Sequence, residues 1–106
     1  MAEHSSDKLP FAKLGERNYR SWHRSMMGHL MGKRCWRVVE PGKSPTDPLE
    51  LHDWELTCEQ ASGLMYAALD DDMQQLVGHL LGHPKAMWDA LAAHVMDLRD
   101  GINYVW

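Results

Sequence analysis

The spacing of the apolar residues constrains the fold of this chain most strongly. The longest stripe steps by four, three, four and three residues and consists of Trp54, Cys58, Ala61, Met65 and Ala68. Steps of three and four place side chains on one face of an α-helix. Three more segments show this spacing: Tyr19, Trp22, Met26 and Leu30; Met73, Leu76, Val77, Leu80 and Leu81; and Met87, Trp88, Leu91, Val95 and Leu98. No stretch shows the alternation of a half-buried strand over more than about five residues. The sequence therefore predicts an all-α fold, a compact bundle of four main helices plus one short helix.

Capping residues and helix breakers predict where the helices begin and end. Asn18 is expected to cap the helix that starts at Tyr19, and Gly32 to stop it. Residues 35–39 are either a helical turn or an extended segment, and residues 40–48 have the composition of a loop. Asp47 and Pro48 should open the second long helix, which we expect to run to about Leu69.

The second half of the chain carries similar signals. Asp70, with its neighbours Asp71 and Asp72, should cap a third helix. Gly82-His83-Pro84 predicts a stop followed by a restart, and Asp100-Gly101 predicts the end of the fourth helix. The expected organisation is a flexible lead-in at 1–10, a helical domain at 11–98 and a hydrophobic tail at 99–106. The tail contains Tyr104 and Trp106, so we expect it to fold back on the core or to bury against another copy.

Composition excludes several classes of protein. The length of 106 residues is typical of one domain, and the net charge of −4 excludes a generally basic nucleic-acid coat. The two cysteines, Cys35 and Cys58, are too few for a disulfide scaffold and suggest reduced intracellular thiols. No apolar run is long enough to span a membrane, and the first residues do not resemble a targeting peptide. We expect a cytoplasmic protein with no membrane partner.

The chain has five Trp and eight Met but one Phe. Trp22, Trp54 and Trp88 each lie on the stripe of a different helix, and we expect the three indoles to meet at the centre of the core. Four methionines share these stripes and should fill the gaps between the indoles: Met26, Met65, Met73 and Met87. Three others lie off the stripes and suit an adaptable protein-binding surface: Met27, Met31 and Met96.

Several of these residues stand in a pattern found in a known family. The motif L-x-x-x-N-Y-x-x-W-x-x-x-M-x-x-x-L-x-x-x-x-x-W-x-x-V runs from Leu14 to Val39 and includes Tyr19, Trp22, Met26 and Trp36. It resembles the opening of the Gag polyprotein of copia-type LTR retrotransposons. Later segments fit the same family in order: Trp54-Glu55, the stretch 64–69, Asp70-Asp71, and 85–91 with Trp88 and Leu91. The resemblance covers roughly residues 11–95.

The resemblance implies a capsid N-terminal lobe, which is an all-helical shell-forming module that multimerises around element RNA. The chain departs from the family where Gly15 stands three residues before Asn18, with Glu16-Arg17 filling the gap. It also contains no C-x-x-C-x-x-x-x-H-x-x-x-x-C zinc knuckle. An excised domain and a truncated or host-adopted Gag remnant are both open.

The sequence offers little for catalysis or metal binding. His79 and His83 are four residues apart, but Gly82 and Pro84 interrupt the helix that would align them. The acidic run 70–72 already has a role as a helix cap, and no Gly-rich phosphate loop is present. We therefore predict no enzyme activity, no metal site and no cofactor.

A cluster of basic residues is a candidate contact for RNA or another anionic partner. Its members are Arg17, Arg20, Arg24, Lys33, Arg34 and Arg37. The first three share a helix face away from the apolar stripe. A solvated or protein-facing surface is the alternative interpretation of this cluster.

The function predicted from these observations is structural, namely a Gag capsid-like domain that self-associates as a dimer or higher homo-oligomer. The expected contact residues are Met31, Met96, Tyr104 and Trp106. One alternative is a monomeric adaptor that holds a peptide of another protein in a groove near Met27, Met31 and the tail. The other is an RNA-contacting module that uses the basic cluster.

Overall fold

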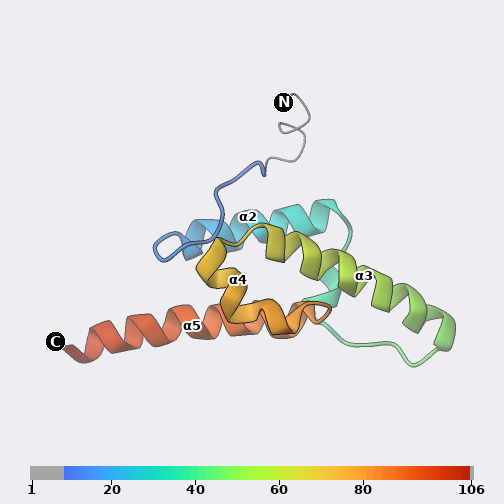
Figure 1. Cartoon of the computed structure of the whole chain (residues 1–106). Coiled ribbons are helices and arrows are strands. Elements are labelled where there is room, and N and C mark those ends of the chain that lie inside the picture. The colour runs from blue at the N-terminus through green and yellow to red at the C-terminus, as the bar shows by residue number, and fades with distance from the viewer. Residues whose placement is uncertain (1–8, 106) are drawn as a thin grey trace.

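A computed structural model of the chain describes the backbone of residues 9–105 and the side chains of residues 9–95. Four α-helices and two short 3-10 turns follow one another: α2 (Tyr19–Gly32), η1 (Trp36–Val38), α3 (Pro48–Ala67), α4 (Asp71–Val77), η2 (Gly78–Leu80) and α5 (Pro84–Val105). Residues 9–105 contain no strand, and one isolated parallel bridge joins Leu14 to Leu69. The predicted all-α fold of four main helices plus a short one is confirmed, with η1 as the short helix. Figure 1 shows α2 and α3 above α5, with α4 between α3 and α5.

Two of the predicted caps are present. The Asp47 carboxylate accepts a hydrogen bond from the Glu50 backbone N–H at 3.1 Å, and the Asp70 carboxylate accepts one from the Met73 N–H at 3.0 Å. Both aspartates have the extended backbone that directs an N-cap side chain toward the first turn. The predicted stop and restart is also confirmed, because Gly82 has φ +89° and α5 begins at Pro84.

The predicted cap at Asn18 is wrong, although α2 does begin at Tyr19 and end at Gly32. The Asn18 Oδ1 accepts the Gly15 N–H at 2.8 Å, and its Nδ2 donates to the Lys13 carbonyl at 2.9 Å. Asn18 has ψ 24° rather than extended backbone, so its side chain turns back to the segment before the helix. It closes the turn that leads into α2.

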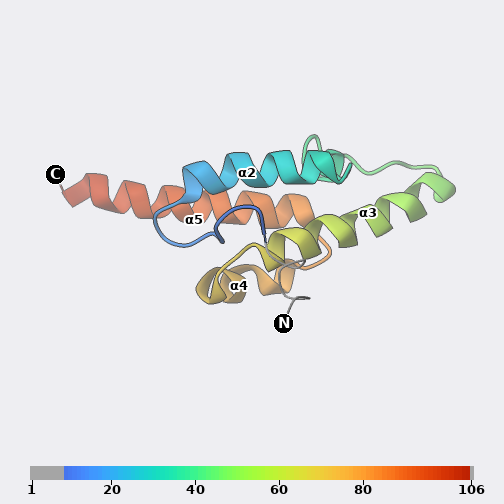
Figure 2. The same ribbon diagram turned by 90° about the horizontal axis from the view of Figure 1, so that it is seen from above.

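The predicted end of the fourth helix is also wrong. Helix α5 does not end at Asp100-Gly101 but passes through Gly101 and continues to Val105. One glycine in a helix interior costs only about 1 kcal/mol, which does not oblige the helix to end. The last turns of α5 extend beyond α2 and α4 rather than folding back over the core (Figures 1 and 2). At the other end, residues 1–8 of the predicted lead-in lie outside the described residues, and Leu9 packs in part against the core.

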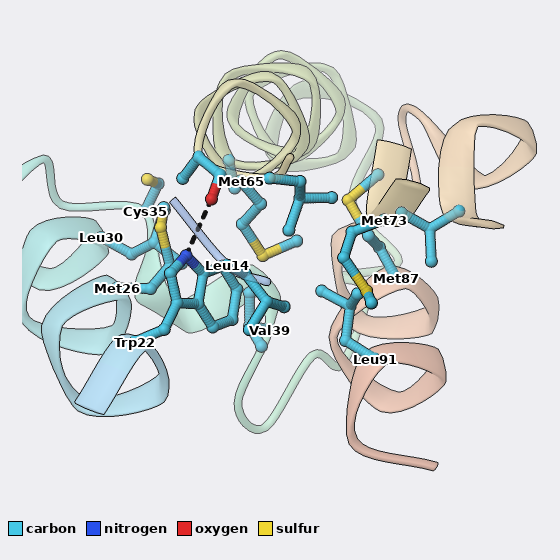
Figure 3. Close-up of a cluster of buried hydrophobic side chains, with 14 of the residues drawn as sticks. Leu14, Trp22, Met26, Leu30, Cys35, Val39, Met65, Met73, Met87 and Leu91 are labelled. Atoms are coloured by element: carbon cyan, nitrogen blue, oxygen red, sulfur yellow. Dashed lines mark hydrogen bonds between the residues drawn. The ribbon is translucent and has the colours of Figure 1, made fainter. Parts of the chain in front are cut away.

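The core contains side chains from all four helices, from η1 and from the segment before α2 (Figure 3). Met26, Met65, Met73 and Met87 are all buried, which confirms the predicted role of these methionines. The other large members of the core are Leu14, Trp22, Leu30, Val38, Val39, Leu69, Val77 and Leu91. The flexible thioethers fill the space between branched side chains and a single fully buried indole.

The prediction that Trp22, Trp54 and Trp88 meet at the centre is wrong for Trp54. The Trp88 ring lies 5.7 Å from the Trp22 ring and 5.1 Å from the Trp36 ring, so the third indole of the cluster comes from η1. Trp54 is half-buried at the edge of the core. It belongs to the amino-terminal half of α3, which extends beyond α2 and α5 (Figures 1 and 2).

The Trp22 indole joins two distant parts of the chain. Its Nε1–H donates to the Ala68 carbonyl at 2.9 Å, and the same carbonyl accepts the Leu14 N–H at 2.8 Å. The Leu14 carbonyl in turn accepts the Asp70 N–H at 3.0 Å. These three bonds hold the segment before α2 and the first turn of α2 against the junction between α3 and α4.

Replacing Trp22 with Phe should lower the free energy of unfolding by about 2–4 kcal/mol, since the variant loses a buried hydrogen bond and part of a fully buried ring. Urea unfolding followed by circular dichroism measures this loss. The matched control is Trp54→Phe at a half-buried position, which should cost less than about 1 kcal/mol. Equal losses in the two variants would contradict the central role of Trp22.

Candidate interaction surfaces

All six basic residues in the predicted cluster are exposed. Arg17, Arg20 and Arg24 lie before and along α2, whose opposite side contributes Trp22, Met26 and Leu30 to the core. Lys33 and Arg34 are exposed at the other end of the same helix, where Arg34 has φ +60°. This arrangement leaves a row of three cations along one side of α2, with Lys33 and Arg34 directly after its last residue.

Arg37 does not join this row. Its guanidinium donates to the Asp53 carboxylate at 3.1 Å, to the Thr57 hydroxyl at 3.3 Å and to the Arg34 carbonyl at 2.9 Å. Arg37 therefore ties η1 to α3. The ion pair with Asp53 is largely solvent-exposed, so its contribution to stability is at most about 1 kcal/mol.

Two hollows adjoin Trp54. One, of about 460 Å³, is lined by Arg37, Lys43, Pro45, Leu49, Glu50, Asp53 and Trp54. The other, of about 400 Å³, is lined by Trp54 and Cys58 together with Val38, Gly42 and residues 82–86 and 89. The predicted groove near Met27 and Met31 does not correspond to either hollow, because neither methionine lines them. The apolar spacing over residues 54–68 predicted that Trp54 lies in the core, and it did not predict the hollows beside this side chain.

Several aliphatic side chains are exposed on the helices. Leu49 is 84% exposed and Leu56 is 53% exposed, both on α3. Leu76 and Leu81, which the stripe of the third helix assigned to the core, are 39% and 47% exposed. That assignment fails because α4 ends after two turns and becomes η2 at Gly78, so a single 3.6-residue period does not extend over 73–81.

Of the four predicted self-association residues, Met31 is 51% exposed at the end of α2. The side chains of Met96, Tyr104 and Trp106 lie outside the described residues. Sequence reasoning did not single out Leu49 and Leu56, since a leucine off the core stripe of a helix is common on protein surfaces. The signal available was their spacing of seven residues, which places both on one side of α3.

The aromatic cluster continues to the surface beyond Trp88. The His23 ring lies 5.2 Å from the Trp88 ring and 5.5 Å from the Tyr19 ring. Burial raises the pKa of the Tyr19 phenol, and the charge of Asp89 raises it further. This end of the core is therefore aromatic and apolar, and the Tyr19 phenol stays neutral at physiological pH.

The described residues show few features of a chemical site. Among residues 9–95, no group of three or more His, Cys, Asp or Glu side chains could hold a metal ion, and His79 and His83 are both exposed. Within the described part of the chain, no helix is long and apolar enough to cross a membrane. No family model, curated protein or solved structure matches this chain.

Both cysteines are free thiols in hydrophobic surroundings. Burial raises the pKa of the Cys35 thiol, while Arg37 and Lys33 oppose the rise. Burial also raises the pKa of the half-buried Cys58 thiol, and Glu55 adds to this effect. A raised pKa keeps both sulfurs protonated, and the protonated thiol is a poor nucleophile.

At about pH 8, Cys35 should react with a thiol reagent only after unfolding, and Cys58 should react more slowly than a free thiol. The Cys58→Ser variant isolates Cys35, and its reaction is followed with and without urea. Since both folded pKa values lie above the unfolded ones, the thiol contribution to stability is fully present below the unfolded pKa. It is lost as the pH rises through the folded pKa. Reaction of the folded Cys58→Ser protein at the rate of a free thiol would contradict this assignment.

Proposed function

We propose that this chain is a non-enzymatic structural domain of the copia-type Gag kind, which works by associating with copies of itself. The motif from Leu14 to Val39 and the all-α fold support the proposal. The two free cysteines support a cytoplasmic location, where thiols are kept reduced.

The observation that carries the proposal is the exposure of Leu49 and Leu56 on α3. Both belong to the amino-terminal half of α3. Figure 1 shows that this half of the helix extends beyond its neighbours. Burying a leucine side chain contributes about 1.5–3 kcal/mol, so four leucines in a symmetric pair contribute about 6–12 kcal/mol. Association itself costs about 4–15 kcal/mol. The gain and the cost are of similar size, so we expect the proposed homo-oligomer to be weak and reversible.

Sedimentation velocity should show a concentration-dependent shift from monomer to a larger species between about 1 and 500 μM. The apolar character of the contact predicts that added salt leaves this shift in place. A strict monomer over the whole range would contradict the proposed function. A shift abolished by moderate salt would instead point to association through the row of cations along α2, formed by Arg17, Arg20 and Arg24.

The hollows beside Trp54 favour a second function, a monomeric adaptor that binds a peptide segment of another protein. A half-buried indole between two concave surfaces can hold an apolar side chain of a peptide. The charged residues that line the first hollow are Arg37, Lys43, Glu50 and Asp53, and since Arg37 pairs with Asp53, Lys43 can contact an acidic neighbour of that side chain.

If the adaptor function holds, peptides selected on this chain from a display library will share an apolar residue next to an acidic one. Their affinity should fall about tenfold in the Lys43→Glu variant, because the change reverses a charge that lines the first hollow. Isothermal titration measures this loss, with Lys13→Glu, an exposed lysine before α2, as the matched control. A selection that yields no common motif, or equal binding by all three proteins, would contradict the adaptor function.

A further inference from the structure

The outer face of α3 repeats every seven residues. Leu49, Leu56 and Gly63 are all exposed and lie on the side of the helix opposite to Ala61 and Met65, which are buried. A step of seven residues returns to the same side of an α-helix to within about 20°. These three residues form a straight apolar line along the helix, which we name the outer α3 face.

This face is uncovered in the described part of the molecule. The amino-terminal half of α3 extends beyond the other helices in both views (Figures 1 and 2). At Gly63, an added Cβ would meet no heavy atom within 4 Å. The glycine therefore leaves open space on the helix surface, two turns from the exposed Leu56.

The polar residues beside the line are ordered as well. His52 and Glu59 are seven residues apart and flank the line on one side, while Asp53 and Gln60 flank it on the other. All four side chains are exposed. On each flank, one polar residue precedes Leu56 and the other follows it. The two residues of a flank differ in chemical character.

We propose that a second copy of the chain binds the outer α3 face, with the two α3 helices antiparallel and a two-fold axis beside Leu56. This inference rests on the proposed function and names its interface. In such a pair, residues equally far before and after position 56 lie opposite each other. The two Leu56 side chains meet at the axis, and Leu49 of each copy fills the space left by Gly63 of the other.

The same antiparallel register also places polar residues of the two copies opposite suitable partners. A two-fold axis brings equivalent flanks of the two helices together, so His52 lies near Glu59 of the second copy and Asp53 near Gln60. In the first contact the His52 imidazole can donate a hydrogen bond to the Glu59 carboxylate, and in the second the Gln60 amide can donate one to the Asp53 carboxylate. Asp53 is also held by Arg37 of its own chain at 3.1 Å, which keeps its carboxylate at the edge of the face. Steric and polar complementarity therefore select the same partner, a second copy in this orientation.

The first test compares two leucine variants by sedimentation equilibrium of the full chain. Leu56→Glu places two carboxylates together at the axis, so the dimer Kd should rise at least about tenfold. Leu76→Glu alters an exposed leucine on α4, away from this face, and should leave the Kd unchanged. Both changes are at exposed positions, and thermal melts verify that each variant is folded.

The second test exchanges the charges of one flank. His52→Glu brings the new carboxylate near Glu59 of the second copy and should weaken the dimer about threefold or more. The double variant His52→Glu, Glu59→His restores opposite characters in the same register and should recover the wild-type Kd to within about twofold. A surface that binds some other part of a second copy has no reason to show this recovery.

The outcomes separate this inference from the proposed function. If the wild-type chain is monomeric at every concentration, the proposed function and this interface are both overturned. If the wild-type chain dimerises and Leu56→Glu behaves like Leu76→Glu, self-association stands and the α3 interface is overturned. If Leu56→Glu weakens the dimer but the charge exchange gives no recovery, the antiparallel register is overturned.

Discussion

The fold depends on one carbonyl group, that of Ala68, and on the two donors that meet it. The Trp22 indole and the Leu14 backbone N–H both donate to this oxygen. Ala68 is the C-cap residue directly after α3, so both bonds fix how the first part of the chain lies against the end of that helix. The indole ring then packs against Trp88 of α5. One side chain thus links three helices, and a polar group that would otherwise be costly to bury is satisfied twice.

The spacing of the apolar residues and the capping residues predicted the helices and most of their ends. Asp47 and Asp70 cap as expected because an aspartate with extended backbone and free N–H groups ahead of it needs no tertiary information. Asn18 has the same capping ability, but its backbone is not extended and its side chain serves the preceding turn. Gly101 does not end α5, since one glycine is a weak penalty over a helix of 22 residues. These errors arise where a local preference is small and the conformation of neighbouring residues decides the result.

The surfaces were harder to predict than the core. A stripe shows which side of a helix faces inward, but it does not show which helices extend beyond their neighbours. For this reason the indole that packs against Trp88 beside Trp22 comes from Trp36 of η1 rather than from Trp54 of α3. For the same reason, the helical spacing did not show that Leu49 and Leu56 are exposed beyond the other helices. Each is an ordinary surface leucine in the sequence, and only the packing of the other helices shows that both lie on one uncovered face. This uncovered face is the basis of the proposal that a second copy of the chain binds α3.

The most direct measurement of this claim is a concentration series of methyl NMR spectra of the full chain, with the leucine methyl groups labelled. If copies associate through the outer α3 face, the Leu49 and Leu56 methyl signals will shift together between dilute and concentrated samples. The signals of Leu76 and Leu81, which are exposed elsewhere, will stay in place. Signals of Leu49 and Leu56 that do not move while the protein self-associates would contradict the account, and uniform shifts of all four leucines would contradict it equally.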